Sequence, residues 1–413
     1  MYTPASNGSP RATRTLTLAF AAALLGACAG EPSAPRVAST VGDGGIRAAT
    51  AANPRETASQ RWIALTRAIV GRRELGPLGI ARTFALVSVA QYNAVVAARQ
   101  GKERAVHPSE AHAAGAASAA ILAGLYPAEQ ATIAAQTTAD VAYFATVPSE
   151  RDADVDAGIA VGKAVAAQVM AYAASDGSNA VWTGTVPTGP GLWVNAPPGP
   201  VSPLWGLVRP WALSSGSQFR PPPPPAFGSP EFLAALGEVR QYTDNRTPEQ
   251  LAIAQFWQFG SGPGGPMGHF GVIATELGSA HRMSELHAAR TFALMYMAMM
   301  DASIGCWDAK FAYWYIRPHQ AGPLITTPVG RPNFPAYPSA HSCLSAAAAG
   351  VLRDIFPAAR GDLEVQVAQA GVARLYAGLH FRFDVSAGQE LGFAVADVVL
   401  ANAPRGHQSI PLD

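Results

Sequence analysis

Apolar residues recur at intervals of three and four along most of the chain, a pattern typical of amphipathic helices. The pattern begins after Arg61, where Ala64, Leu65, Ala68 and Ile69 fall on one helical face. Beyond it we predict helices at 109–145, 149–176, 229–243, 247–259, 270–316, 339–356, 359–379 and 383–402. No stretch alternates apolar and polar residues between hairpin turns. The chain is therefore expected to be almost all-α.

The segment 177–230 departs from the helical pattern. It contains a run of five prolines at 221–225 and four tryptophans, which are Trp182, Trp193, Trp205 and Trp211. A flexible linker would not carry so many large aromatic side chains. We therefore predict an ordered loop that lies over the helices and is pinned by its rings. A second loop, rich in glycine and proline, is expected at 260–268.

The N-terminal segment has the pattern of a targeting signal. Arg11 and Arg14 precede an apolar run at 16–25, which is too short to span a bilayer permanently. The run ends in Leu25-Gly26-Ala27-Cys28, which resembles the lipobox of bacterial lipoproteins, where the cysteine is lipidated; ordinary cleavage is the alternative. We interpret 1–28 as a signal peptide, 29–57 as a flexible tether and 58–413 as a single helical domain. The protein is expected to be exported, either periplasmic, anchored to the outer membrane through Cys28, or secreted.

Composition narrows the classes of function. Charged residues make up 14% of the chain and apolar residues 49%, and the net charge is +1, whereas an average domain has roughly 25% charged residues. Such a chain can bury a large core, and it lacks the basic face of a nucleic-acid binder. No run of 18 apolar residues follows the N-terminal segment, so the domain is expected to be soluble, with a membrane contact only through the N-terminal lipid.

Candidate chemistry is concentrated in three segments near the C-terminus. Lys310 and Arg317 are seven residues apart, which corresponds to two helical turns and one face. The residues between them are apolar or aromatic, so two buried cations are expected there, and they need an anion. Ser339 follows Pro338 at the predicted start of a helix, where free backbone N–H groups bind anions. Taken alone, Ser339 would be an ordinary N-cap.

Two histidines and a third cation complete the set. His341 lies in the first turn of that helix, where the helix dipole disfavours the protonated ring unless an anion lies beside it. The spacing from His380 to Asp384 suits a carboxylate that holds one ring nitrogen while the other faces a ligand. Arg374 lies six residues before His380. A single such histidine would usually be a satisfied core residue, whereas the combination points to a site.

Together and in this order, the segments resemble the signature of the superfamily of vanadium-dependent haloperoxidases and type 2 phosphatidic acid phosphatases. That signature reads K-x6-R-P, then P-S-G-H, then S-R-x5-H-x3-D; here it spans 310–318, 338–341 and 373–384. Trp307 and the run at 334–339 resemble the soluble bacterial haloperoxidase-like branch. The resemblance implies an all-α helical bundle of the vanadium haloperoxidase and acid phosphatase type, with the long Pro/Trp-rich loop laid over it.

The sequence departs from the signature at two positions, and from many soluble relatives at a third. Ala340 replaces the motif glycine and Ala373 the motif serine. Gly260 stands where soluble relatives often have an acidic residue, so an aspartate that would steady Arg374 is expected to be missing. These changes leave the anion-binding groups in place and bear on which reaction follows.

The resemblance also implies roles. An oxyanion, vanadate or phosphate, would be bound by Lys310, Arg317, Ser339, Arg374 and the backbone N–H of Ala340. His380 would be the metal ligand, oriented by Asp384, and His341 the acid–base. The leading interpretation is a haloperoxidase that oxidises halide with hydrogen peroxide. An acid phosphatase working through a phosphohistidine is the alternative, and a lipoprotein that only binds an oxyanion is a third. Substrates would be small molecules, and a homodimer is expected by analogy with large helical relatives.

Three further residues, Cys306, Cys343 and His319, each allow two interpretations. Cys306 and Cys343 lie in apolar helical surroundings and are expected to be buried free thiols, although an exported protein could join them in a disulfide. His319, directly after Arg317-Pro318, could reach the site or cap a turn.

Overall fold

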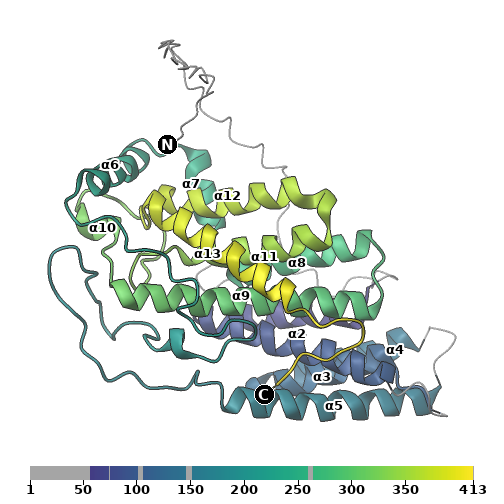
Figure 1. Cartoon of the computed structure of the whole chain (residues 1–413). Coiled ribbons are helices and arrows are strands. Elements are labelled where there is room, and N and C mark those ends of the chain that lie inside the picture. Colours follow the sequence, from purple (N-terminus) through teal and green to yellow (C-terminus); the bar gives the residue numbers. More distant parts are fainter. Residues whose placement is uncertain (1–55, 74, 101–105, 146–150, 259–263, 413) are drawn as a thin grey trace, which may run out of the picture. The chain divides into compact units, whose positions relative to one another are not determined.

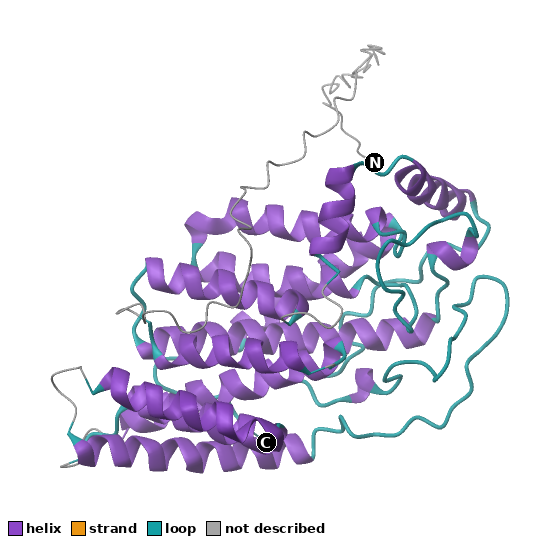
Figure 2. Cartoon of the chain, turned by 180° about the vertical axis from the view of Figure 1, so that it is seen from behind, coloured by secondary structure: helices purple, strands orange, loops and turns teal. Residues whose placement is uncertain are grey.

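The computed structural model describes residues 56–73, 75–100, 106–145, 151–258 and 264–412. The predicted signal peptide, and the tether as far as residue 55, lie outside these ranges. The α-helices are α1 (Ala58–Arg72), α2 (Pro77–Gln100), α3 (Glu110–Leu125), α4 (Gln130–Phe144), α5 (Asp152–Ala174), α6 (Pro230–Asp244), α7 (Pro248–Phe256), α8 (Gly265–Ala280), α9 (Glu285–Tyr313), α10 (Pro318–Ala321), α11 (Ala340–Ile355), α12 (Arg360–Tyr376) and α13 (Arg382–Ala401). Short 3₁₀ helices are η2 (Pro127–Glu129), η3 (Trp205–Leu207) and η4 (Pro357–Ala359). The described residues form no strand (Figure 2), and the all-α prediction is confirmed.

Two long predicted helices are each divided in two. The segment predicted at 109–145 forms α3 and α4, because Pro127 lacks an N–H and restricts Tyr126, whose φ and ψ are −132° and 70°. The segment predicted at 270–316 forms α8 and α9, since Ser284 caps a new helix by accepting from the His287 N–H. Helix α8 begins at Gly265, inside the range 260–268 that was predicted to be a loop. The short helix α10 was not predicted.

Helix α9 is the core of the domain. It packs against α2 and against α11 and α13 (Figure 1), and most of its residues are buried. A helix that is apolar on all sides is expected in such a position. Lys310 lies in the last turn of α9 and is carried into the interior by this packing.

The starts of α11 and α13 are fixed to each other by close backbone packing. A Cβ atom at Gly388 would lie 2.6 Å from the Ser339 carbonyl oxygen, and one at Gly392 would lie 2.3 Å from that of Cys343. Only glycine permits this approach. The Ser339 N–H donates to the Asp384 carbonyl at 2.9 Å. The two C-terminal signature segments therefore lie against each other.

The long loop between α5 and α6 is ordered over the helices. Its residues 211–213 donate three backbone N–H bonds to the buried carboxylate of Asp301, at 2.8 to 3.1 Å. Three tyrosine hydroxyls donate to its proline carbonyls, the pairs being Tyr313–Pro221, Tyr315–Pro225 and Tyr337–Pro222. Since Tyr315 and Tyr337 each lie two residues before a predicted anion ligand, the loop supports the site from behind.

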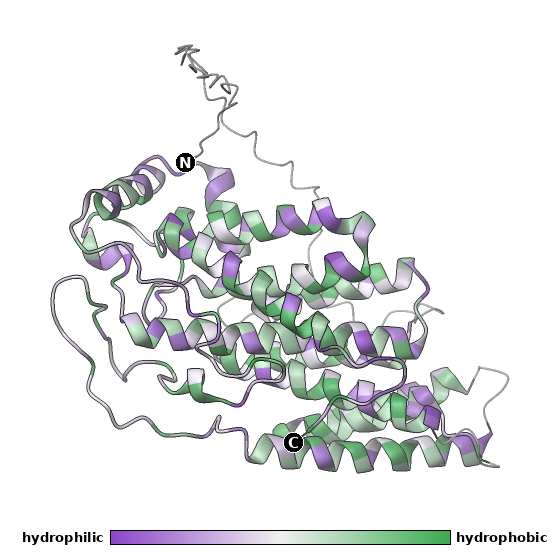
Figure 3. Cartoon of the chain, in the orientation of Figure 1, coloured by the Kyte–Doolittle hydropathy of each residue, from purple (hydrophilic) through white to green (hydrophobic). Residues whose placement is uncertain are grey.

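Two of the described helices, α2 and α5, are long and apolar enough to cross a membrane by length and composition alone. The apolar window of α2 is 89% buried, as in a core helix, and that of α5 is 39% buried. Hydrophilic residues gather at the N-terminal end of α5 (Figure 3).

Candidate oxyanion site

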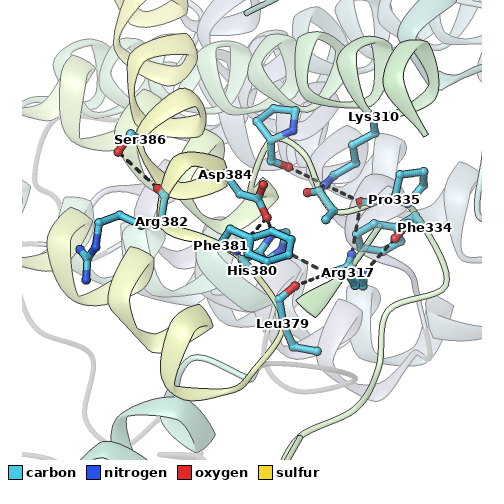
Figure 4. Close-up of polar contacts among 12 residues, drawn as sticks. Lys310, Arg317, Phe334, Pro335, Leu379, His380, Phe381, Arg382, Asp384 and Ser386 are labelled. Carbon is cyan, nitrogen blue, oxygen red and sulfur yellow. Dashed lines mark hydrogen bonds and ion pairs between the residues drawn. The ribbon is translucent and has the colours of Figure 1, made fainter. Parts of the chain in front are cut away.

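Lys310 is wholly buried and is held by the loop that precedes α11. Its Nζ donates to the carbonyls of Pro335, Ala336 and Pro338 at 2.9, 2.6 and 2.5 Å (Figure 4). Burial lowers the pKa of this ammonium to about 8. All three of its N–H bonds are used by carbonyls, so Lys310 shapes the loop as well as placing a positive charge beneath it.

Arg317 links the same loop to the segment before α13. Its Nε donates to the Phe334 carbonyl at 2.9 Å, and one terminal nitrogen donates to the Leu379 carbonyl at 3.0 Å. That nitrogen also lies 3.3 Å from His380 Nε2 (Figure 4). Burial lowers the pKa of the guanidinium to about 9, which leaves it charged at neutral pH.

Lys310 and Arg317 meet, but not for the predicted reason. The helix α9 ends at Tyr313, and Trp314 adopts a left-handed conformation with φ of 49°. Arg317 lies beyond this reversal, at the N-cap of α10. The two cations are therefore brought together because both hold the loop at 334–338, and the two-turn spacing on one helix face is a wrong explanation.

His380 is oriented by Asp384. Its Nδ1 lies 2.9 Å from Asp384 Oδ2, and the Phe381 N–H donates to the same oxygen at 3.0 Å. Because the carboxylate accepts from Nδ1, the lone pair of the ring is on Nε2. Burial, reinforced by Arg317, holds the pKa of His380 well below its ordinary value, and burial raises the pKa of Asp384 to about 7. The neighbouring Arg382 points away from this cluster (Figure 4), and its Nε donates to Glu238 at 2.7 Å.

Ser339 and Arg374 present donors that nothing in the described residues accepts. Ser339 is the N-cap of α11, yet its hydroxyl makes no capping bond and is buried. Arg374, in the last turn of α12, has a buried Nε atom with no partner in the same ranges. Ala340 is buried and begins α11, where backbone N–H groups have no intrahelical acceptor.

His341 lies on the more open side of the cluster. The residue is partly exposed, and its ring Nε2 lies 2.8 Å from the carbonyl oxygen of Trp257. The same carbonyl accepts from a terminal nitrogen of Arg374 at 3.0 Å. Burial, and then the charge of Arg374, lower the pKa of His341 well below its ordinary value. The ring is therefore neutral at neutral pH when no anion is present.

Trp257 was not predicted as part of the site. The aspartate expected to be missing would have been at Gly260, which lies outside the described residues. Arg374 donates to the carbonyl at the C-cap of α7. A backbone carbonyl leaves no mark in the residue types, so no pattern in the sequence could have shown this contact.

The other residues that the sequence allowed two interpretations for are His319, Cys306 and Cys343. His319 is hydrogen-bonded to the backbone of Gly378, and burial lowers its pKa to about 4. Cys306 and Cys343 are buried free thiols. The Cys306 thiol donates to the Pro338 carbonyl at 3.7 Å, the same oxygen that Lys310 uses.

The charges of this cluster do not balance. Lys310, Arg317 and Arg374 are three buried cations, and Asp384 is the one carboxylate buried among them in the described part of the chain. Buried charges are stable only when paired. An oxyanion would supply the missing negative charge and would accept from the open donors of Ser339 and Arg374.

Residues 287–406, which contain every predicted site residue, match the family model of the PAP2 superfamily. This segment belongs to the PAP2 superfamily. The chain is also similar to a solved bacterial vanadium-dependent iodoperoxidase, with a TM-score of 0.72 and 22% identity over 84% of this chain and 96% of that one. A bacterial vanadium-dependent chloroperoxidase matches in its holo form (TM-score 0.63, 16% identity, 79% and 92% covered) and in its apo form (0.65, 15%, 79% and 94%).

At these identities the similar structures show the fold. No curated protein sequence matches the chain. The recognition of the superfamily from three short segments is confirmed, and so is the helical architecture that it implied.

Proposed function

We propose that this protein is a vanadium-dependent haloperoxidase, which oxidises halide with hydrogen peroxide while vanadate is held at His380. The observation that carries the proposal is the surplus of buried positive charge, three cations against one carboxylate, beside the open donors of Ser339 and Arg374. A tetrahedral oxyanion matches this set in charge and in its number of acceptor oxygens. The names of the similar structures support vanadate as that anion.

The site residues would have two roles toward bound vanadate: hydrogen-bond donors and cations around it, and one histidine ligand. Ser339 Oγ, Arg374 Nε and the Ala340 N–H would donate to the anion, and Lys310 and Arg317 would neutralise its charge. His380 would offer Nε2 as the ligand, since Nδ1 is committed to Asp384. Bound vanadate would supply Lewis acidity that activates peroxide.

His341 would move the proton. Its neutral ring can accept a proton from hydrogen peroxide near neutral pH, and it can return that proton as the product forms. The other predicted site side chains are buried, which suits charges that must stay fixed.

An acid phosphatase on the same residues is the second candidate. It is favoured by the lone pair on Nε2 of His380, since the carboxylate of Asp384 accepts from Nδ1 on the other side of the ring, as in an activated nucleophile. Nε2 would attack phosphorus, the bond to the ester oxygen would break, and His341 would protonate the leaving oxygen. The buried cations would stabilise the transferring phosphoryl group in the same way.

One paired assay separates the two. Purified protein is freed of bound metal and anion, and is then assayed with orthovanadate, hydrogen peroxide and iodide, bromide or chloride. A second aliquot receives a generic aryl phosphate ester, with and without vanadate. Halide oxidation that requires vanadate and is inhibited by phosphate supports the haloperoxidase. Ester hydrolysis that vanadate inhibits, without halide oxidation, supports the phosphatase. If the protein shows neither activity, the interpretation that remains is a protein that only binds an oxyanion.

We also propose that the protein is exported and lipidated at Cys28, ahead of the flexible tether; these residues lie outside the described ranges. The resemblance further implies a homodimer and small-molecule substrates. Mass spectrometry of the mature N-terminus would test the lipid anchor.

A further inference from the structure

Trp257 joins two of the candidate site residues through its backbone. It is wholly buried at the C-cap of α7. Its carbonyl accepts from Arg374, on α12, at 3.0 Å and contacts His341 Nε2, on α11, at 2.8 Å. One oxygen atom therefore fixes the position of two side chains that come from different helices.

This contact determines which nitrogen of His341 carries the proton. A carbonyl oxygen can only accept, so the ring must donate from Nε2. Nδ1 then holds the lone pair and is the atom that can take up a proton. Because a carbonyl is neutral, it orients the ring without stabilising the imidazolium as strongly as a carboxylate would.

The indole of Trp257 ties that carbonyl to α12 a second time. Its Nε1 donates to Gln369 Oε1 at 3.0 Å, and Gln369 lies on α12 five residues before Arg374. The indole also lies 5.0 Å from the ring of His269, whose Nε2 is 2.9 Å from Gln366 Oε1, one turn earlier on α12. Trp257 is thus attached to α12 at both its backbone and its side chain.

We infer that Trp257 is a positioning residue of this site: its carbonyl holds the Nε2–H form of His341 and one edge of Arg374, and Gln369 fixes that carbonyl through the indole. The inference rests on the proposed function only in taking His341 as the acid–base and Arg374 as an anion ligand. The simpler role for a buried tryptophan is to fill the core. That role predicts no effect on a histidine tautomer.

The test uses variants that remove the indole bond and one that keeps it. Gln369→Leu removes the acceptor, Gln369→Glu retains an acceptor, and Trp257→Phe keeps a ring but loses the donor. Ser303→Ala is the matched control, because it deletes the acceptor of another buried indole, that of Trp205, at 2.9 Å. Two quantities are measured on the full chain: the ¹⁵N shifts of the His341 ring, assigned with His341→Gln, and the dissociation constant of vanadate.

The expected result is a native His341 ring protonated at Nε2. Gln369→Leu and Trp257→Phe should give a mixture of tautomers and vanadate binding about tenfold weaker, as for other partners of ligand side chains. Gln369→Glu and Ser303→Ala should behave as the native protein in both measurements.

Two results would overturn the inference. One is a native His341 ring protonated at Nδ1. The other is a folded Gln369→Leu variant with the native tautomer and native vanadate affinity. Should Trp257→Phe fail to fold, Gln369→Leu still decides, because Gln369 is only partly buried. If the native protein binds neither vanadate nor phosphate, the proposed function fails, and the tautomer measurement tests the positioning role independently.

Discussion

The two halves of the site hold their histidines in opposite ways. On one side the His380 ring donates to the carboxylate of Asp384, and its neighbours Lys310 and Arg317 donate to backbone carbonyls. On the other side the His341 ring is held by the neutral carbonyl of Trp257. A carboxylate makes the opposite ring nitrogen a better ligand and nucleophile. A neutral acceptor leaves the ring free to change its protonation state.

The same contrast extends to the donors. On the His380 side the two cations are already tied, without an anion, into the loop at 334–338 and the segment at 379–384. The His341 side contains Arg374, whose Nε is open, and Ser339, whose hydroxyl has no partner in the described residues. The difference indicates that the first side is a preformed support, and that the second side completes its hydrogen bonds only when an anion is bound.

Of these variants, His380→Ala should reduce turnover the most. It removes the ligand or nucleophile, so turnover by either proposed reaction should fall by at least about 10⁴-fold. The measurement is kcat/KM with saturating vanadate, or with the phosphate ester. A folded His380→Ala protein with native turnover would remove His380 from the mechanism.

His341→Ala should have the next largest effect. Loss of an acid–base group typically costs about 10² to 10⁴-fold in turnover, while the anion keeps its buried donors and its ligand. Vanadate affinity should therefore change far less than kcat. His287→Ala, an exposed histidine at the start of α9, is the matched control and should keep native turnover. Equal losses of affinity and turnover would show that His341 is a binding residue.

Asp384→Asn should make the two sides alike. Asparagine can still accept from His380 Nδ1 and from the Phe381 N–H, so the geometry is kept while the charge is removed. Turnover should fall by about 10 to 100-fold. Sulfate affinity should not weaken, because the surplus of positive charge increases. Native turnover in this variant would mean that the charge at position 384 does not distinguish the two histidines.

Residue types and spacing predicted the helical class, the superfamily and the set of side chains that meet. The predictions that were wrong or missing have a common physical cause: backbone carbonyls, which the residue types do not reveal, position several of the site side chains. Lys310 and Arg317 are brought together by carbonyls of the loop at 334–338 after α9 has ended at Tyr313, and Trp257 acts through its carbonyl. The sequence shows which side chains are present, but the path of the backbone that places such carbonyls depends on the packing of the whole domain.

The smallest expected effect is on the pH dependence of anion affinity, and it tests which side takes up the proton. Burial and Arg374 hold the pKa of His341 well below its ordinary value, and a bound anion would raise it again. Binding would then take up a proton, so affinity is full at low pH and falls as pH rises through the pKa of His341 in the complex. The fall is at most about tenfold per pH unit for one proton.

Sulfate is the suitable probe, because it keeps its charge between pH 5 and 8 whereas phosphate does not, and calorimetry gives its dissociation constant. Asp384, whose pKa burial raises to about 7, also titrates in this range, and its ionisation would weaken sulfate binding in the same direction. Lys310, whose pKa burial lowers to about 8, loses charge only toward the upper end of the range. The variants separate His341 from Asp384. His341→Ala should flatten the dependence, and Asp384→Asn should retain most of it. If the slope instead persists in His341→Ala and disappears in Asp384→Asn, the carboxylate side takes up the proton, and the roles given to the two histidines must be exchanged.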